Sequence, residues 1–150
     1  YPLSPMKVLL QRVCSSKVEV DGEIVGQINR GLLVFVGIEK NDNQACADKI
    51  INKIMSYRVF PDSDNKMNLS VHDINGDLLL VSQFTLAVDT NTGSRPGFSK
   101  AMKPQEAEVL YNYFLKKTQK VNKKTESGRF GADMKVSIVN DGPVTFLLEV

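Results

Sequence analysis

The segment Gly-Leu-Leu-Val-Phe-Val-Gly-Ile at residues 31–38 limits the possible folds of this chain more than any other part of its sequence. Its residues are almost all apolar, without the alternation of apolar and polar residues that a strand with one wet face shows. A strand is apolar throughout when the sheet is covered on both faces, so we expect 31–38 to be a central, buried strand. Leu78, Leu79, Leu80 and Val81 form a second run of this kind, inside a strand predicted over 76–86.

Alternating patterns predict the remaining strands. Val8 and Leu10, and then Val18 and Val20, alternate with polar residues, which is typical of half-buried strands. Asp21-Gly22 is a strong signal for a type I′ hairpin turn, with a returning strand over 24–28.

Later in the chain, the sequence predicts a short strand over 57–60 that Pro61 ends, and then a polar loop over 62–68. Two further strands, 134–139 and 144–150, are expected near the end of the chain, joined through 140–143.

Two segments have helical periodicity. Residues 44–55 place Ala47, Ile50, Ile51 and Ile54 on one stripe, with Asn41 or Asp42 as the expected N-cap. Residues 104–122 begin with a proline in the first turn and carry a second apolar stripe made of Ala107, Leu110, Tyr111, Phe114 and Leu115. The expected fold is therefore a strand-rich α+β domain with two main helices.

Two loops stand out. Residues 89–100 are rich in Thr, Asn, Gly, Ser and Pro, which favours a long surface loop, and loops of this length are often functional. Residues 128–133 form a second loop, which contains two glycines.

The chain has 150 residues, 42% of them hydrophobic, and a net charge of +2, which describes one globular domain without an overall demand for a polyanionic partner. We assign residues 6–150 to that domain and interpret residues 1–5 as a cloning remnant, because Met6 opens the first strand-like run. No signal peptide and no membrane span are expected. Cys14 and Cys46 are expected to be reduced, half-buried thiols, which predicts a cytoplasmic protein.

The residues offer few groups for classical catalysis. His72 is the only histidine, so a zinc site and a Ser-His-Asp triad are not expected, and His72 is interpreted as a surface residue. The sequence contains neither a P-loop nor a dinucleotide-binding motif, and no cofactor or other metal is expected. Ser82 and Thr85 lie at the end of a buried strand, where they either serve a functional site or satisfy backbone groups. Gly142-Pro143 reads from its residue types alone as an ordinary trans turn.

A cluster of basic residues follows the second helix. Its members Lys116, Lys117, Lys120, Lys123, Lys124 and Arg129 face a single nearby acid, Glu126. Cations complement a helix C-terminus, so a solvated face is one interpretation. The other is contact with the end of a nucleic acid, with Phe130 available for stacking.

Taken together, two motifs change these interpretations. Residues 82–86 (Ser-Gln-Phe-Thr-Leu) and 140–145 (Asn-Asp-Gly-Pro-Val-Thr) resemble the two signature motifs of the D-aminoacyl-tRNA deacylase family. The resemblance extends from residue 6 to residue 150, with the opening residues 6–13 similar to that family's first strand. Gly97 is a departure, because a serine is expected at that position.

The resemblance implies a barrel-like domain of mixed or antiparallel sheets, a homodimer, and hydrolysis of the ester between a D-amino acid and the terminal adenosine of tRNA, with glycyl-tRNA as a further substrate. It implies a catalytic segment made of Ser82, Gln83, Phe84 and Thr85, and a cis peptide at Gly142 and Pro143 that enters the partner subunit and excludes L-amino acids. It also implies an adenosine pocket formed by Phe130, Gly131, Ala132 and Met134, and it favours an RNA contact by Lys116, Lys120, Lys123, Lys124 and Arg129.

For Thr85, we favour backbone N–H groups and water, assisted by the 2′-hydroxyl of the RNA, over a hydroxyl nucleophile, since no neighbouring base is evident. Two alternative functions stay open. The chain could be an inactive RNA-binding module of the same fold, or an editing domain for L-aminoacyl-tRNA.

Overall fold

The long strand β1 (Lys7–Val20) organises the sheet in the computed structural model, which describes residues 6–91 and 93–150. One edge of β1 pairs with β3 (Gly31–Gly37) along its first half and with β2 (Glu23–Ile28) along its second half. The other edge pairs with β8 (Lys135–Glu149) along almost the whole strand. The two short strands expected around Val8 and Val18 are therefore one continuous strand of 14 residues.

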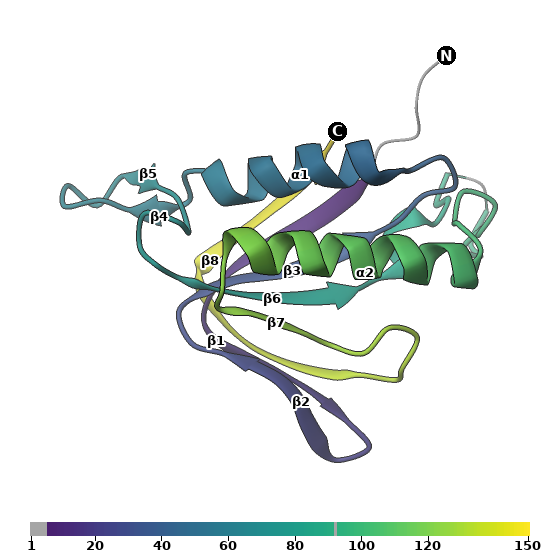
Figure 1. Ribbon diagram of the computed structural model, residues 1–150, viewed down its shortest axis with the longest axis horizontal. Helices are drawn as coiled ribbons and strands as arrows, with labels where there is room; N and C mark the ends of the chain where they lie inside the picture. The colour runs from purple at the N-terminus through teal and green to yellow at the C-terminus, as the bar shows by residue number, and fades with distance from the viewer. Residues whose placement is uncertain (1–5, 92) are drawn as a thin grey trace.

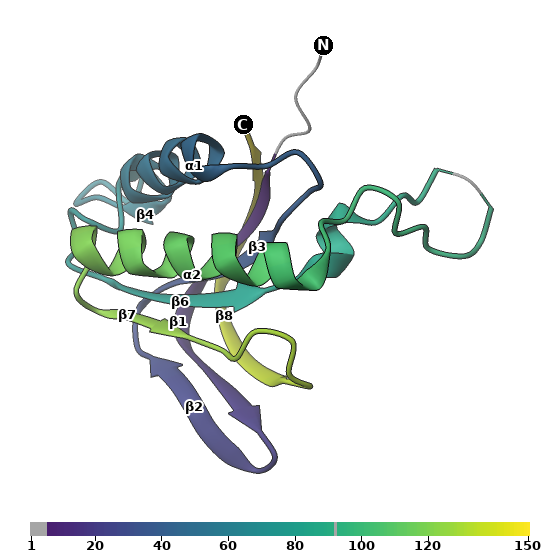
Figure 2. The same ribbon diagram turned by 45° about the vertical axis from the view of Figure 1, so that its right-hand side comes forward.

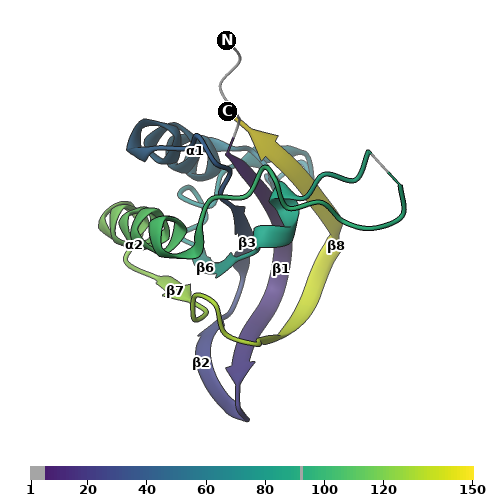
Figure 3. The ribbon, with the colours of Figure 1, turned by 90° about the vertical axis from the view of Figure 1, so that its right-hand side faces the viewer.

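The apolar segment at 31–38 forms the central strand as predicted. β3 pairs with β1 on one side and, in parallel, with β6 (Asp77–Ser82) on the other, and β6 continues to β7 (Thr125–Ser127). The sheet has the order β2-β1-β3-β6-β7, with β8 on the free edge of β1. It mixes parallel and antiparallel pairs and curves strongly (Figure 3). The predicted α+β, barrel-like class is confirmed.

Two helices lie side by side over one face of the sheet (Figure 1). They are α1 (Gln44–Ser56) and α2 (Pro104–Val121), whose apolar stripes bury Ile50, Ile54, Leu110 and Phe114 against alternate residues of β1, β3 and β6. A smaller cluster on the opposite face includes Val18, Leu33, Leu79 and Val81. β3 and β6 are thus covered on both faces, which explains their continuous apolar sequences.

The structure corrects the expected cap of α1. Its N-cap is Asn43, whose side chain accepts a hydrogen bond from the N–H of Cys46 at 3.0 Å, and neither Asn41 nor Asp42 has that role. Asp42 instead turns back to accept a hydrogen bond from the N–H of Glu39 at 2.6 Å. Capping of this kind depends on backbone direction, which the sequence left open among three neighbouring polar residues.

Several strand boundaries differ from prediction. The expected strands at 134–139 and 144–150 are one strand, β8, because pairing with β1 continues on both sides of Gly142 through two register shifts. β4 (Phe60–Pro61) includes Pro61 and pairs with β5 (Met67–Leu69), inside the stretch expected to be loop. The chain after β6 turns into a short 3-10 helix, η1 (Phe84–Ala87), instead of extending as a strand to residue 86.

Other expectations are confirmed. Asp21 and Gly22 have positive φ angles of 52° and 82°, as a type I′ turn requires. His72 is exposed, as is Cys14, which corrects the half-buried position expected for that thiol, whereas Cys46 is half-buried. Neither helix of the described residues is long and apolar enough to cross a membrane. The proposed remnant at residues 1–5 lies outside the described residues.

Candidate functional site

The candidate site lies where β3 and β6 end together. Val36 pairs with Ser82 in the parallel register, and the N–H of Gln83 then donates to the carbonyl of Val36 at 2.8 Å. Directly beyond this bond, the chain turns into η1. A Cβ atom at Gly37 would lie 2.5 Å from Cβ of Leu86, so glycine is needed for η1 to pack this closely on β3.

Two hollows open on either side of this turn and share Ser82, Phe84 and Gly131. The smaller hollow, of about 220 Å³, is completed by Val81, Gln83, Ala132, Met134 and Val136. The larger one, of about 620 Å³, is mainly apolar and includes Phe98, Met102, Lys103, Ala107 and Phe130. A concave, mostly apolar site with few polar groups is typical of small-molecule recognition.

Aromatic contacts shape the larger hollow. Phe130 packs on Tyr111 with ring centroids 5.7 Å apart, and Phe84 packs on Phe98 at the same separation. The Tyr111 hydroxyl donates to the carbonyl of Leu80 at 3.1 Å and lies 2.6 Å from the Ser127 hydroxyl. Burial raises the pKa of Tyr111 to about 12. The bond from its hydroxyl to β6 and its packing on Phe130 place Phe130 next to this strand.

The loop that carries Phe98 is anchored to the rest of the domain. It projects beyond α2 (Figure 2), yet Asp89 and Gly97 exchange two backbone hydrogen bonds, at 2.8 and 3.0 Å. The N–H of Lys40 donates to the carbonyl of Lys100 at 2.8 Å. Gly97 has space for a side chain, because an added Cβ would meet Asp89 only at 3.5 Å. The departure from the expected serine at this position is therefore compatible with the loop.

Two carboxyl groups are buried in the segment that holds this loop. Glu39 and Asp42 are 3% and 7% exposed, and Oε2 of Glu39 lies 3.9 Å from Nζ of Lys7. Burial raises the pKa of Asp42 to about 7, and the nearby Glu39 carboxylate adds to this effect. Burial also raises the pKa of Glu39, against the attraction of Lys7 and Lys100 and with the repulsion of Glu149.

The structure brings together some of the predicted site residues and separates others. Ser82, Gln83, Phe84, Gly131, Ala132 and Met134 line the smaller hollow, and Phe130 lines the larger one. Thr85 lines neither hollow; its exposed hydroxyl accepts a hydrogen bond from the Gln83 side-chain amide. Gly142 and Pro143 are exposed, and neither lines the hollows of this chain.

The predicted basic residues divide into two groups. Arg129 directly precedes Phe130 at the larger hollow, whereas Lys116 and Lys120 lie in the C-terminal half of α2 and Lys123 and Lys124 follow it. Pro104, the first residue of the same helix, is one of the residues that line the larger hollow. The lysines therefore lie at the far end of α2 from the candidate site.

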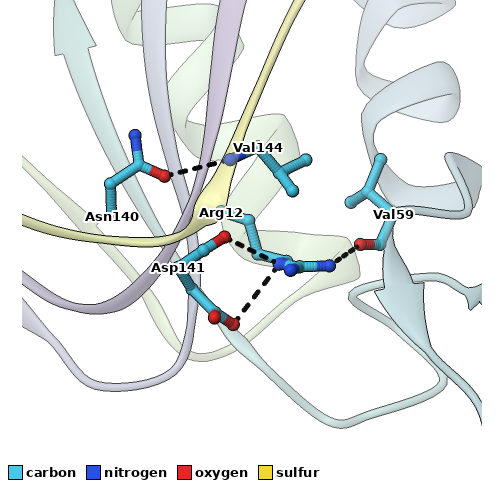
Figure 4. A network of polar contacts seen from close by, with 5 residues as sticks. All are labelled: Arg12, Val59, Asn140, Asp141 and Val144. Atoms are coloured by element: carbon cyan, nitrogen blue, oxygen red, sulfur yellow. Dashed lines mark hydrogen bonds and ion pairs between the residues drawn. The ribbon is translucent and has the colours of Figure 1, made fainter. Parts of the chain in front are cut away.

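The peptide bond between Gly142 and Pro143 is cis, as the family resemblance implied and unlike the trans turn expected from residue types alone. Arg12 binds Asp141, the residue that precedes this Gly-Pro pair (Figure 4). Its Nε donates to the carbonyl of Asp141 at 3.2 Å and lies 3.3 Å from the Asp141 carboxylate, while Nη1 donates to the carbonyl of Val59 at 2.6 Å. Asn140 adds an accepted bond from the N–H of Val144 at 3.2 Å.

Sequence reasoning missed two parts of this site. Arg12 was read only as part of a strand, and nothing in its neighbourhood could reveal partners 47 and 129 residues away. Met102, Lys103 and Ala107 were not expected to form a wall of the larger hollow, although the composition of 89–100 did mark the preceding loop as functional.

Comparison with known proteins gives consistent matches along the chain. Residues 9–149 match the D-Tyr-tRNA(Tyr) deacylase family. A D-aminoacyl-tRNA deacylase of Pseudomonas fluorescens strain Pf-5 is 57% identical, and one of Stutzerimonas stutzeri strain A1501 is 58% identical, each match covering 96% of this chain and 99% of the relative.

Solved structures agree in fold. A structure described as c-Myc DNA Unwinding Element Binding Protein has a TM-score of 0.93 and 41% identity, covering 97% of this chain and 99% of that one. A second, described as a probable eukaryotic D-amino acid tRNA deacylase, has a TM-score of 0.86, covering 97% of this chain and 100% of that one. At 15% identity it shows a shared fold only.

We predict that Arg12→Ala lowers the free energy of unfolding by about 3 kcal/mol, because it leaves the Val59 carbonyl and the Asp141 carboxylate without their buried partner. Arg12→Lys should lose less, since it keeps the charge but not the planar fork. Urea denaturation at pH 7 measures both, with the exposed Arg95→Ala as control. An Arg12→Ala protein as stable as wild type would contradict this assignment.

We predict that the contribution of Asp42 to stability falls as pH rises between about 4 and 7, because the unfolded chain releases the Asp42 proton at its ordinary pKa of 3.8 while the folded protein retains it up to about 7. Asp42→Asn removes this cost and keeps an acceptor for the N–H of Glu39. At pH 8 the variant should be more stable than wild type by about 2–4 kcal/mol. Thermal unfolding from pH 5 to 8 checks this, with exposed Asp64→Asn as control; identical pH profiles for wild type and Asp42→Asn would refute it.

Proposed function

The chain belongs to the D-Tyr-tRNA(Tyr) deacylase family, and we propose that it hydrolyses the ester that joins a D-amino acid to the terminal adenosine of tRNA, releasing the free amino acid and tRNA. The observation that carries this proposal is identity of 57–58%, over 96% of the chain, to proteins named D-aminoacyl-tRNA deacylase. Glycyl-tRNA is a further proposed substrate, because glycine has no side chain for a steric selector to reject. The cytoplasm is the proposed location.

The two adjoining hollows suit the two parts of this substrate. We place the adenine in the larger hollow, where the ring of Phe130 is held by Tyr111 and Gly131 allows close approach of the backbone. The aminoacyl group then lies in the smaller hollow, beside Ala132 and Met134. The ester lies between them, next to the shared residues Ser82 and Phe84.

Water is the proposed nucleophile. Its oxygen forms a bond to the ester carbonyl carbon while the bond to the ribose 3′-oxygen breaks, and the 2′-hydroxyl of the RNA passes a proton from the water to that 3′-oxygen. The N–H groups of Phe84 and Thr85 open η1, where the first donors of a helical turn lack partners within it, and they stabilise the developing oxyanion.

The Thr85 hydroxyl is a poor candidate nucleophile in this arrangement. It accepts a hydrogen bond from the side-chain amide of Gln83, a group that is not basic enough to remove a proton. Nucleophilic hydroxyl groups in proteins depend on a neighbouring base. Gln83 therefore positions the turn in this proposal, and Thr85 contributes its backbone.

Gly142 and Pro143 are proposed to act in a second copy of the chain. Along the sheet, Ser82 lies level with Val36 and Val8, whereas the Gly-Pro pair lies near Arg12. Four residues of strand are about 13 Å, and the step from β8 across β1 and β3 to β6 is about 14 Å. The exposed pair thus lies too far from Ser82 of its own chain to touch the same substrate.

Exposed apolar side chains on β8 support self-association. Val139 and Leu147, whose partners on β1 share one face, are 54% and 51% exposed, on the strand that also presents Gly142 and Pro143. A two-fold homodimer that buries these side chains would let each subunit present its Gly-Pro pair to the partner's site. The backbone of the pair would then leave no room for an L side chain, while a D side chain would point away from it.

An inactive RNA-binding module of the same fold is the alternative. Such a module would need the hollow for a nucleotide but would not need an aminoacyl hollow beside it. The smaller hollow next to Ser82 and Gln83 favours the enzyme.

Purified protein incubated in parallel with D-tyrosyl-tRNA and L-tyrosyl-tRNA tests the proposed activity. We expect rapid release of D-tyrosine and a rate on the L-ester close to that without enzyme, because the selector excludes the L side chain by steric overlap. Acid-precipitable radiolabel measures both reactions. Equal hydrolysis of the two esters, or none of either, would exclude a chiral deacylase.

The role of Thr85 is tested by a pair of substitutions. Thr85→Ala should retain activity within about threefold of wild type, because it keeps the N–H, whereas Thr85→Pro, which removes it, should lose about 100-fold or more in kcat. Circular dichroism melting curves control for folding. A folded but inactive Thr85→Ala protein would instead favour a hydroxyl nucleophile.

A further inference from the structure

A third hollow lies far from the reaction site, between the C-terminal ends of the two helices. It has a volume of about 440 Å³ and is open to solvent. α1 contributes Asn52, Met55 and Ser56, and the end of α2 contributes Val121. The chain between α1 and β6 contributes Arg58, Ser70, His72 and Asp73. We call it the helix-end groove. No part of the deacylase chemistry proposed above uses it.

Donor groups dominate the polar lining of the helix-end groove. Arg58 is cationic, His72 has at least one ring N–H, and Asn52 and Ser56 add an amide and a hydroxyl. Asp73 is the acid of the groove; its carboxylate accepts a hydrogen bond from the N–H of Ser70 at 2.8 Å. Hydrogen bonds from the backbone and side chain of Ser70, together with the nearby His72 and Arg58, lower the pKa of Asp73, so this carboxylate is ionised at neutral pH and offsets part of the positive charge of the groove.

Residues just after α2 contact the loop that carries His72, which lines the groove. Nζ of Lys124 donates to the carbonyl of Asn75 at 3.5 Å, and the Asn122 side chain donates to the carbonyl of Gly76 at 3.2 Å, which ties the end of α2 to the loop that carries His72. Lys117 pairs with Asp48. Among the described residues, the ion pairs include none of Lys116, Lys120, Lys123 and Lys124, so these four charges are available to a ligand.

The helix α2 links this surface to the reaction site. It begins at Pro104, on the larger hollow, and ends at Val121, on the helix-end groove. Figures 1 and 2 show that both helices run along the sheet with their C-terminal ends beside β4. A helix of 18 residues is about 27 Å long. An RNA with its terminal adenosine in the larger hollow would therefore need a stem along α2 to reach the groove.

We infer that the helix-end groove and the lysines at the end of α2 bind the sugar-phosphate backbone of the double-helical stem of the substrate RNA, at the opposite end of this helix of about 27 Å from the larger hollow. This inference rests on the proposed deacylase function and adds a second contact region for the same substrate. Cations spread along one end of a domain, with hydroxyl and amide donors between them, match regularly spaced phosphates. Binding here adds affinity without reading the amino acid or the terminal base.

The test uses the full chain with two substitutions, Arg58→Gln and Lys124→Gln, and a control protein with Lys17→Gln and Lys135→Gln. The control loses the same charge from β1 and β8, outside the helix-end groove. Fluorescence anisotropy of labelled, uncharged tRNA gives the affinity as a function of salt. In parallel, kcat/KM is measured on D-tyrosyl-tRNA and on the D-tyrosyl ester of a CCA trinucleotide.

The groove variant should bind tRNA about tenfold or more weakly than wild type at 0.1 M salt. Each phosphate contact raises the affinity at 0.1 M salt by a factor of roughly eight over its value at 1 M salt, and the variant loses two such contacts. Its salt slope should fall by about two, one for each contact removed. Its kcat/KM should drop by a similar factor on tRNA and stay within about twofold on the trinucleotide ester, whereas the control should match wild type in every measurement.

Unchanged tRNA affinity in the groove variant would overturn the inference and leave the groove to a protein partner. An equal loss of kcat/KM on tRNA and trinucleotide would overturn it too, because the substitutions would then act through the reaction site. If wild type binds tRNA but hydrolyses neither ester, the deacylase proposal fails, while the anisotropy comparison still decides whether the groove contacts RNA.

Discussion

The parallel pairing of β3 with β6 is the constraint on which the rest of the site depends. Parallel strands end at one edge of the sheet, and their register places Ser82 beside Val36 there. The bond from the N–H of Gln83 to the carbonyl of Val36 continues this pairing for one more residue. The chain must then turn, and the turn separates the smaller hollow from the larger one. Tyr111, bonded to the carbonyl of Leu80, docks α2 on the same strand. A change in this one register would displace both hollows together.

The length of β1 has a different consequence. Because it pairs with β8 on its free edge, the Gly-Pro segment is carried on the same sheet as the reaction site but two strands beyond β3. Arg12 then connects this segment to the carbonyl of Val59, just after α1. The guanidinium is 9% exposed, so its hydrogen bonds form away from bulk water, where leaving a partner unsatisfied is costly. The Gly-Pro segment, which we propose as a selector for the partner subunit, is thus held by buried contacts of its own domain.

Recognition and reaction are separated along α2. Around the reaction site, the lining is mostly apolar, and Lys103 is the cationic side chain among the residues that form the two hollows. Most of the basic cluster lies at the other end of the helix, beside Arg58. This division suits the proposed substrate, a small reactive ester on a large anionic RNA, because phosphate contacts would raise affinity for every tRNA while the hollows would distinguish the amino acid.

The sequence by itself determined the parts that follow from local chemistry. Continuous apolar runs predicted the buried strands, helical stripes predicted α1 and α2 within one residue at each end, and Asp21-Gly22 predicted its turn. Two motifs identified the family and the residues around Ser82. Only the tertiary structure decided the contacts between distant segments: the continuity of β8 across Gly142, the partners of Arg12, and the distance between the lysines and Phe130. Strand register and helix direction set these contacts, and both depend on how whole elements pack, which no local stretch of residues records.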